Sequence, residues 1–352
     1  MLRRLATGAY ALAWLAVLGG LAGELWLVLQ RRASAERARG YSESNVFTRS
    51  RGVAEGATLW RDRGVRYRPG AHLTLEVAGT TYEIAINSRG FRTQEFEVPK
   101  PAGRLRVVCV GGSTTVQGGT NQETYPAILE RLLRRDLPGR SIEVLNLGIN
   151  GTGTGYWLTR QEELFSYQPD LIVQYNFVND LFWELLPEYA AAHPWRRRLG
   201  RSLLLSGWFP IDAADFTAGL LRTVRRHRAL AHQARRQGVA YVAGTFAGPD
   251  PATSSPELAA YLDQNVEAWG WPLALRHYRD YYRLLTRYDT LFESDARGRL
   301  FTLVPVHRLV SDGSLFVDLC HMTPEGIERL AQAFLPAATD ALRDAGRATA
   351  ED

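Results

Sequence analysis

Four short segments of this chain carry the side chains and turns that an acyl-transfer reaction requires. They read Gly-Gly-Ser-Thr at 111–114, Asn-Leu-Gly-Ile-Asn-Gly at 146–151, Asn-Phe-Val-Asn-Asp at 176–180 and Asp-Leu-Cys-His at 318–321. Acyl transfer needs a nucleophile, a base that takes its proton, a group that orients the base and donors for the oxyanion. Each segment offers at least one of these parts, although each is a weak signal alone.

The residue types suggest a role for each position. Ser113 is the candidate nucleophile, because its turn of small residues can expose the hydroxyl. His321 is the candidate base, and Asp318, three residues earlier, can fold back to accept a hydrogen bond from Nδ1. The backbone amides of Ser113 and Gly148, together with the side chain of Asn179, can supply three donors to an oxyanion.

Each assignment has an ordinary structural alternative. No Gly-Lys-Ser/Thr follows the 111–114 turn, which argues against a phosphate-binding loop. His307 is the second candidate base, but it has no carboxylate at the same short spacing. Gly148 can be a plain turn glycine, and Asn179 with Asp180 can cap the next helix.

The segments between these motifs alternate between strand and helix patterns, which predicts an α/β fold with a parallel sheet covered on both faces. Ligands of open α/β sheets bind outside the carboxyl ends of the strands. Ser113, Gly148 and Asn179 each follow a predicted strand, so we expect them at one edge of the sheet. The predicted strands are 104–110, 142–147, 171–176, 239–246 and 300–306, and the predicted helices are 124–137, 156–167 and 324–342.

The order Ser, Gly, Asn and then Asp-x-x-His resembles the SGNH (GDSL-like) hydrolases over residues 104–342, and the 318–326 segment is its most specific part. The resemblance implies a serine esterase with a three-layer α/β/α sandwich and a flavodoxin-like sheet. It also implies Ser113, Asp318 and His321 as the triad, Ser113, Gly148 and Asn179 as the oxyanion hole, and no metal or organic cofactor.

Two positions depart from the family pattern. Gly112 stands where the GDSL motif has aspartate, and Phe177 stands where the third block usually has glycine. Neither change removes a catalytic group. We expect Phe177 to narrow or reshape the substrate pocket.

The chain divides into three predicted parts: an anchor and linker at 1–40, a small β-rich lobe at 41–103 and the hydrolase domain at 104–345. The lobe includes a predicted hairpin of strands 72–77 and 81–86. The hydrolase domain carries a helical insert at about 181–238 with Trp183, Trp195 and Trp208. These aromatic residues can cap an acyl or glycan pocket, contact the membrane or pack the insert onto the sheet.

Residues 5–30 are almost continuously apolar, interrupted chiefly by Glu24, and a bilayer-spanning helix needs roughly 20 such residues. A cleavable signal peptide is the alternative, but the stretch is longer than a signal core and arginines precede the small residues after it. We therefore predict an uncleaved transmembrane helix. Basic residues flank both ends, so placing the catalytic domain outside the cytoplasm rests on the resemblance to anchored relatives.

Composition excludes other classes of protein. The 352 residues carry a net charge of +5, but 41 of the 42 basic residues are arginine and no nucleic-acid-binding motif accompanies them. We expect no nucleic-acid partner. Cys109 and Cys320 lack metal-ligand or redox spacing, and a disulfide between them is not expected.

The leading prediction is hydrolysis of an acyl ester, with O-acetyl groups of a cell-envelope glycan as the candidate substrate. An O-acyltransferase would use the same triad with a sugar hydroxyl in place of water. A lipid or thioester esterase is a further alternative, as is a catalytically idle glycan-binding protein. The sequence does not separate the first three.

Overall fold

The computed structural model describes residues 2–44, 60–62, 66–77, 80–195, 202, 204, 211–269, 275, 277–296 and 300–351. Trp208 of the predicted insert lies outside these residues.

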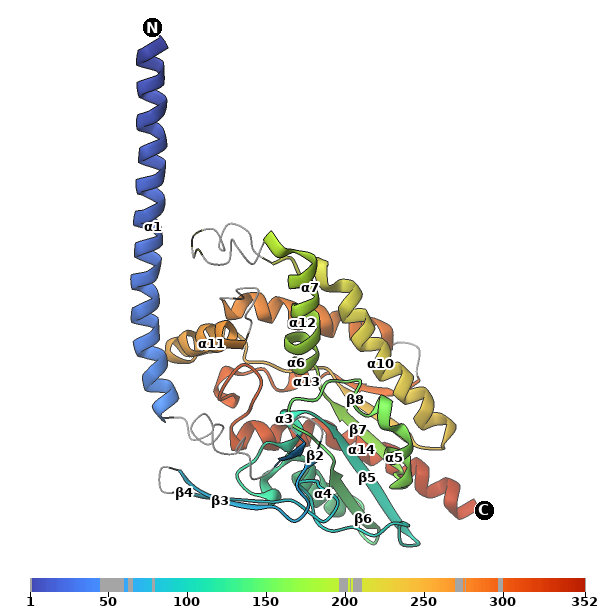
Figure 1. The fold of residues 1–352 in the computed structure, drawn as a ribbon. Helices are drawn as coiled ribbons and strands as arrows, with labels where there is room; N and C mark the ends of the chain where they lie inside the picture. The colour runs from blue at the N-terminus through green and yellow to red at the C-terminus, as the bar shows by residue number, and fades with distance from the viewer. Residues whose placement is uncertain are drawn as a thin grey trace.

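In the described part of the chain, five strands form one parallel sheet in the order β6-β5-β7-β8-β9 (Figure 1). This is the flavodoxin-like order, in which the sheet's second strand along the chain, β6, lies at one edge. All residues of β7 are buried, as expected for a strand covered on both faces. The predicted fold class is therefore confirmed. The strands are β5 (Arg104–Gly111), β6 (Ser141–Asn146), β7 (Leu171–Tyr175), β8 (Ala240–Gly244) and β9 (Thr302–Val304).

Two pairs of helices cover the sheet. Helix α4 (Tyr125–Asp136) packs with α14 (Pro324–Glu351), and α10 (Thr217–Arg236) packs with α12 (Tyr278–Ala296). In α4, proline in the first turn and arginines in the last turn suit the two ends of a helix. The predicted helix at 156–167 is instead a 3₁₀ turn, η2 (Leu158–Arg160), followed by α5 (Gln161–Ser166).

Shorter elements complete the body and its insert. The helices are α3 (Ser113–Val116), α6 (Val178–Asp180), α7 (Leu186–Ala192), α11 (Pro256–Trp269) and α13 (Val306–Leu309). The 3₁₀ turns are η1 (Asn121–Glu123), η4 (Ala213–Phe216) and η5 (Gly313–Leu315), and η3 (Leu181–Leu185) is a π-helical turn.

Stacked aromatic rings join the sheet to the helices near the carboxyl ends of the strands. Tyr175, the last residue of β7, stacks on Phe246 with ring centroids 4.9 Å apart. Phe334 of α14 lies edge-on to Tyr175 at 6.0 Å and stacks with Tyr125 of α4 at 5.8 Å. These close-packed rings support the loops that follow the strands.

The segment before the main sheet contains two antiparallel strand pairs. β3 (His72–Val77) and β4 (Thr80–Ala85) form the predicted hairpin, and β1 (Trp60–Asp62) pairs with β2 (Arg66–Tyr67). Arg92 ties this segment to the body, because its guanidinium donates to the carbonyl oxygens of Val116 at 2.7 Å and Gly118 at 3.0 Å. The end of α3 is thereby braced from outside the sheet.

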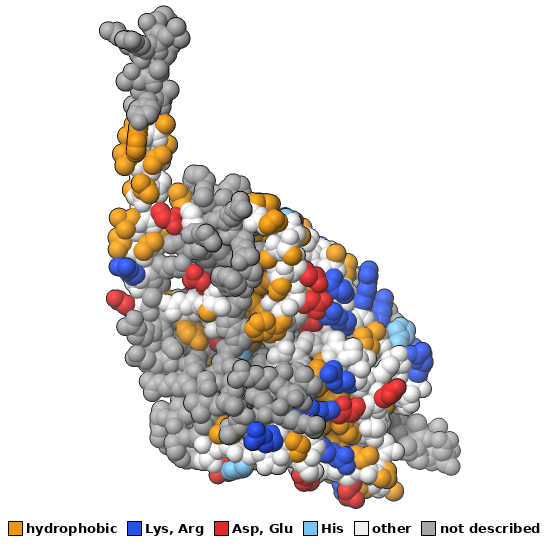
Figure 2. Space-filling view, viewed as in Figure 1, with side chains coloured by type: hydrophobic (Ala, Val, Ile, Leu, Met, Phe, Trp, Pro, Cys, Tyr) orange, Lys and Arg blue, Asp and Glu red, His pale blue; other side chains and the backbone are white. Residues whose placement is uncertain are grey.

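Helix α1 (Leu2–Ser44) is a single helix that includes the predicted linker. Its window Leu12–Gln30 has a mean hydropathy of 1.9 and no buried residue, and in the described residues it is the one helix apolar and long enough to cross a membrane. A signal sequence has the same properties. α1 packs beside α11 and projects far beyond the body, with apolar side chains along its free part (Figures 1 and 2).

Candidate active site

Ser113 begins α3, two residues after β5 ends at Gly111. The amides of Thr115 and Val116 both bond to the carbonyl oxygen of Gly112, at 3.0 and 3.3 Å, which closes the turn directly after the strand. The first amides of a helix have no partner within the helix, so the amide of Ser113 is available to an oxyanion. The half-buried hydroxyl of Ser113 thus lies at the carboxyl edge of the sheet, as predicted.

A tight loop carries His321. An isolated bridge pairs Phe316 with Met322 and closes the loop, and the amide of Val317 donates to the carbonyl oxygen of His321 at 2.9 Å. Inside the loop, Asp318 Oδ1 accepts from the amides of Cys320 at 2.9 Å and His321 at 2.7 Å. One carboxylate oxygen of Asp318 therefore fixes the backbone, and the other remains for the imidazole.

The structure brings the three predicted triad residues together. His321 Nδ1 lies 2.7 Å from Asp318 Oδ2, and Nε2 lies 2.8 Å from Ser113 Oγ. Because a carboxylate only accepts, this pairing assigns the proton to Nδ1 and leaves Nε2 to accept from the serine hydroxyl. His321 is only 5% exposed. Gln117, at the end of α3, accepts from the amide of Met322 at 2.8 Å and links the serine turn to the histidine loop.

The glycine of the second segment packs against the helix of the serine. A Cβ on Gly148 would lie 2.9 Å from both Thr115 Cβ and Val116 Cγ2. Close packing on α3 therefore excludes a side chain at this position. The Gly148 amide donates to Asn146 Oδ1 at 3.0 Å, so this donor is occupied in the structure.

Asn179 lies in α6, directly beside the serine turn. Its Nδ2 donates to the carbonyl oxygen of Thr152 at 2.9 Å, and a Cβ on Gly112 would lie only 2.5 Å from it. An amide group carries two hydrogens, so one remains for a further acceptor. The residue at the N-terminal cap of α6 is Phe177 and no side chain caps this helix, so Asn179 does not act as its cap.

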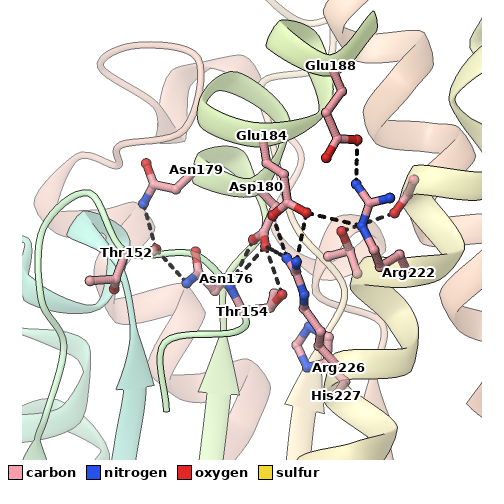
Figure 3. A network of polar contacts seen from close by, with 12 residues as sticks. Thr152, Thr154, Asn176, Asn179, Asp180, Glu184, Glu188, Arg222, Arg226 and His227 are labelled. Carbon is pink, nitrogen blue, oxygen red and sulfur yellow. Dashed lines mark hydrogen bonds and ion pairs between the residues drawn. The ribbon is translucent and has the colours of Figure 1, made fainter. Parts of the chain in front are cut away.

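A partly buried polar network that the sequence did not reveal holds the turn of Asn179 (Figure 3). Asp180 accepts from the Thr154 amide at 2.9 Å, from the Thr154 hydroxyl at 2.8 Å and from Arg226 Nη1 at 3.0 Å. Arg226, on α10, also binds Glu184 through both terminal nitrogens, at 2.6 and 2.7 Å. Burial raises the pKa of Asp180 to about 6, although the hydrogen bonds from Thr154 and the charge of Arg226 oppose this.

Two other residues from the sequence analysis contact groups outside the triad. Phe177 is fully buried and its ring stacks on Tyr288 with ring centroids 3.9 Å apart. Its effect on the substrate pocket stays a prediction. His307, the second candidate base, has Nδ1 2.7 Å from Thr245 Oγ1 and Nε2 3.8 Å from Glu293. Burial lowers its pKa. The structure pairs Ser113 with His321 and not with His307.

Both cysteines are free thiols. Cys109 is buried in β5, where burial raises the pKa of its thiol, and it has no access to solvent. Asp318, Cys320 and His321 place an oxygen, a sulfur and a nitrogen within 4.8 Å of one another, a spacing compatible with a metal ion. Since the same carboxylate and imidazole bond to each other, we assign no metal to them.

Comparison with protein families gives the identity of the fold. Residues 109–329, well over half of the chain, match the GDSL-like lipase/acylhydrolase family. The chain belongs to this family. As a GDSL-like acylhydrolase, it is an enzyme of the class that hydrolyses ester bonds.

Solved structures include partial matches to this GDSL-like protein, whereas no curated protein sequence matches it significantly. A catalytic mutant of an acetylxylan esterase from Geobacillus stearothermophilus is 18% identical, with 66% of this chain and 93% of that chain covered and a TM-score of 0.42. A carbohydrate acetylesterase family member from Sinorhizobium meliloti is 14% identical, with 68% and 99% covered and a TM-score of 0.44.

Proposed function

We propose that this GDSL-like protein hydrolyses an acyl ester through Ser113, His321 and Asp318 by way of a covalent acyl-enzyme. The observation that carries the proposal is the continuous pair of contacts, 2.7 and 2.8 Å, that joins the carboxylate to the imidazole and the imidazole to the hydroxyl. This is the arrangement of nucleophile, base and orienting group that activates a serine.

The reaction follows from these contacts. His321 Nε2 takes the proton of Ser113 as Oγ attacks the ester carbonyl carbon, and the C=O electrons move onto the oxygen. The tetrahedral intermediate then expels the alcohol, which takes the proton from Nε2, and leaves the acyl group on Ser113. A water molecule repeats the two steps, releasing the carboxylic acid and restoring the serine. Asp318 holds the imidazole and stabilises its transient positive charge.

We assign the oxyanion to the amides of Ser113 and Gly148 and to Asn179 Nδ2. Asn179 has the strongest support, because its amide group lies against Gly112, next to the nucleophile. Gly148 must exchange its bond to Asn146 for one to the oxyanion during the reaction. Such an exchange is compatible with a donor that engages fully only in the transition state.

For the substrate, we propose a short acyl ester, with the O-acetyl groups of a cell-envelope glycan as the candidate. A helix that held the enzyme at a membrane would keep it close to envelope polymers.

We also propose that α1 remains attached as an anchor, with the catalytic body outside the cytoplasm. Support for retention comes from the contacts of α1 with the body: the helix continues to Ser44, packs beside α11 and binds Ser202 through Glu24 at 2.8 Å. Cleavage after the apolar stretch would remove Glu24 and its bond to Ser202.

Turnover of p-nitrophenyl acetate by the full chain in detergent tests the proposal, with Ser113→Ala as its inactive counterpart. Ser113→Ala removes the nucleophile without adding bulk, so we expect turnover to fall to background. Equal rates for the wild type and Ser113→Ala would refute the triad and favour a binding role. Product analysis with an acetylated glycan, with and without an added acceptor, then distinguishes release of acetate from transfer to a sugar hydroxyl.

A further inference from the structure

One face of α1 is covered within its apolar window. The window Leu12–Gln30 is mostly exposed, but a set of residues at intervals of three and four is only half-exposed. Such intervals define a single face of a helix. The body therefore lies alongside the apolar part of α1 and not only beyond its end. The half-exposed residues are Gly20, Gly23, Glu24, Leu27 and Val28.

The covering groups come from the helical insert. The Glu24 carboxylate accepts from Ser202 Oγ at 2.8 Å and from the amide of Leu204 at 2.9 Å. Leu204 Cδ1 would lie 3.7 Å from a Cβ on Gly23, in ordinary van der Waals contact. A carboxylate in an apolar layer is costly unless it is hydrogen-bonded. The groups that donate hydrogen bonds to Glu24 must then lie at the same depth in the membrane as Glu24.

The length of α1 sets that depth. The 19 residues of the window extend about 28 Å as a helix, close to the thickness of the hydrocarbon layer. Glu24 lies about 9 Å along the helix before Gln30, so Ser202 and Leu204 would lie below the headgroups. If the bilayer instead covers residues 5–23, the same two residues lie at the headgroup boundary. Both placements bring the insert to the membrane.

The insert also presents indole rings. Trp183 in η3 is 64% exposed and Trp195, after α7, is 47% exposed. In the part of the chain that the structure describes, Val98 and Leu309 are the other large apolar side chains exposed outside α1. Indole rings prefer the interface between headgroups and hydrocarbon. α7 rises from the body towards the level of the apolar part of α1, and apolar side chains lie on this part of the body (Figures 1 and 2).

We propose that Trp183, Trp195 and Leu204 form a bilayer-docking surface, and that the bonds of Glu24 to Ser202 and Leu204 fix the body against it. We assign lipid as the occupant of the surface, because Leu204 lies against Gly23 within the apolar window of α1 and exposed indole rings favour the membrane interface. The enzyme would then be held at one orientation to the membrane, and not tethered at the end of a free helix. This inference rests on the proposed retention of α1 and is independent of the triad.

Fluorescence of the full chain in phosphatidylcholine and phosphatidylglycerol vesicles tests the surface. Trp183→Cys and Trp195→Cys are labelled with an environment-sensitive dye, since the native cysteines are buried. Asp340→Cys is the control, because the Asp340 side chain is 77% exposed and lies in the C-terminal half of α14. This helix runs away from α1 to the opposite end of the body (Figure 1). We expect a blue-shifted emission and quenching by brominated lipid at 183 and 195, but not at 340.

Water-like dye emission at all three positions would overturn the proposal. Dye shielding at 183 and 195 that increases with the number of protein molecules per vesicle, and not with brominated lipid, would also overturn it, because it would indicate contact with a second copy of the chain. Glu24→Ala should reduce the quenching at 195, whereas Glu24→Gln, which keeps an acceptor, should preserve it. Intact mass measures whether α1 is retained, and its loss would also overturn the proposal. Turnover of p-nitrophenyl acetate is measured in every variant, so failure of the docking surface and failure of the esterase proposal are distinguishable.

Discussion

Adding a single methyl group at Gly112 should displace the proposed oxyanion donor Asn179. The backbone of Gly112 has φ −92° and ψ −146°, so alanine meets no left-handed strain there. Its Cβ would lie 2.5 Å from Asn179 Nδ2 and 3.1 Å from the carbonyl oxygen of Thr152. The side-chain amide can move and the backbone carbonyl cannot, so we expect Asn179 to turn away and to lose its bond to Thr152.

The size of the effect follows from the loss of one donor. Removing a single oxyanion donor typically lowers kcat by about 100- to 1000-fold, or about 3–4 kcal/mol of transition-state stabilisation. Overpacking a filled site costs about 1–3 kcal/mol of folding free energy. Gly112→Ala should therefore fold and bind ester with a nearly unchanged KM, but turn over slowly. Gly112→Asp, which restores the residue of the GDSL motif, should be at least as slow.

The assay is steady-state turnover of p-nitrophenyl acetate by Gly112→Ala, Asn179→Ala and the double variant. If both single changes remove the same donor, the double variant is no slower than the slower single variant. Gly155→Ala is the matched control, because its Cβ would meet the nearest atom, in Arg226, at 3.5 Å. Wild-type kcat in Gly112→Ala would refute the reasoning. Multiplicative losses in the double variant would show that Gly112 acts through another group.

Three further changes test the rest of the site. Burial raises the pKa of Asp180 from 3.8 to about 6, so the folded chain holds this proton more tightly than the unfolded chain. Its contribution to the unfolding free energy then falls by up to about 3 kcal/mol between about pH 4 and pH 6, and Asp180→Asn should remove that slope in urea unfolding across this range. Phe177→Gly, which installs the usual family residue, removes the ring stacked on Tyr288 and should cost about 3–5 kcal/mol or more in the same unfolding assay; an unchanged midpoint would contradict the observed packing. Asp318→Asn should lower kcat by about 10³- to 10⁴-fold, because an amide that still accepts from the loop amides turns its NH₂ towards His321 and favours the wrong tautomer; a near-normal kcat would remove Asp318 from the triad.

The proximity of Ser113, Gly148 and Asn179 was predictable from the sequence, because the carboxyl ends of neighbouring parallel strands lie at the same edge of a sheet. Ser113, Gly148 and Asn179 follow β5, β6 and β7, three neighbouring strands whose carboxyl ends share an edge. His321 follows no strand of the sheet, and it was predictable from a local signal, the carboxylate of Asp318 three residues earlier. Strand boundaries agreed within a few residues, since apolar runs mark strands that are buried on both faces.

The supporting contacts were not predictable in the same way. Arg226 is one of 41 arginines and lies on a helix of the insert, and nothing in the local pattern marks it as the partner of Asp180. The burial of Phe177 depends on Tyr288 of α12, which is distant in the chain. The packing of Gly148 on α3 likewise depends on how closely two loops approach. These features depend on tertiary packing, to which sequence periodicity is insensitive.

The helical insert contacts both the turn of Asn179 and helix α1, which are far apart in the sequence. Its helix α10 supplies Arg226, which holds Asp180 beside the proposed oxyanion donor, and the preceding stretch supplies the Ser202 hydroxyl that binds Glu24 of α1. The first contact is partly buried in the body and involves no residue of α1. Removal of α1 should therefore leave turnover of a soluble ester intact, whereas removal of the insert should release both the turn of Asn179 and the position of α1. We therefore expect the chemistry to depend on the insert, and α1 to determine only where the chemistry occurs.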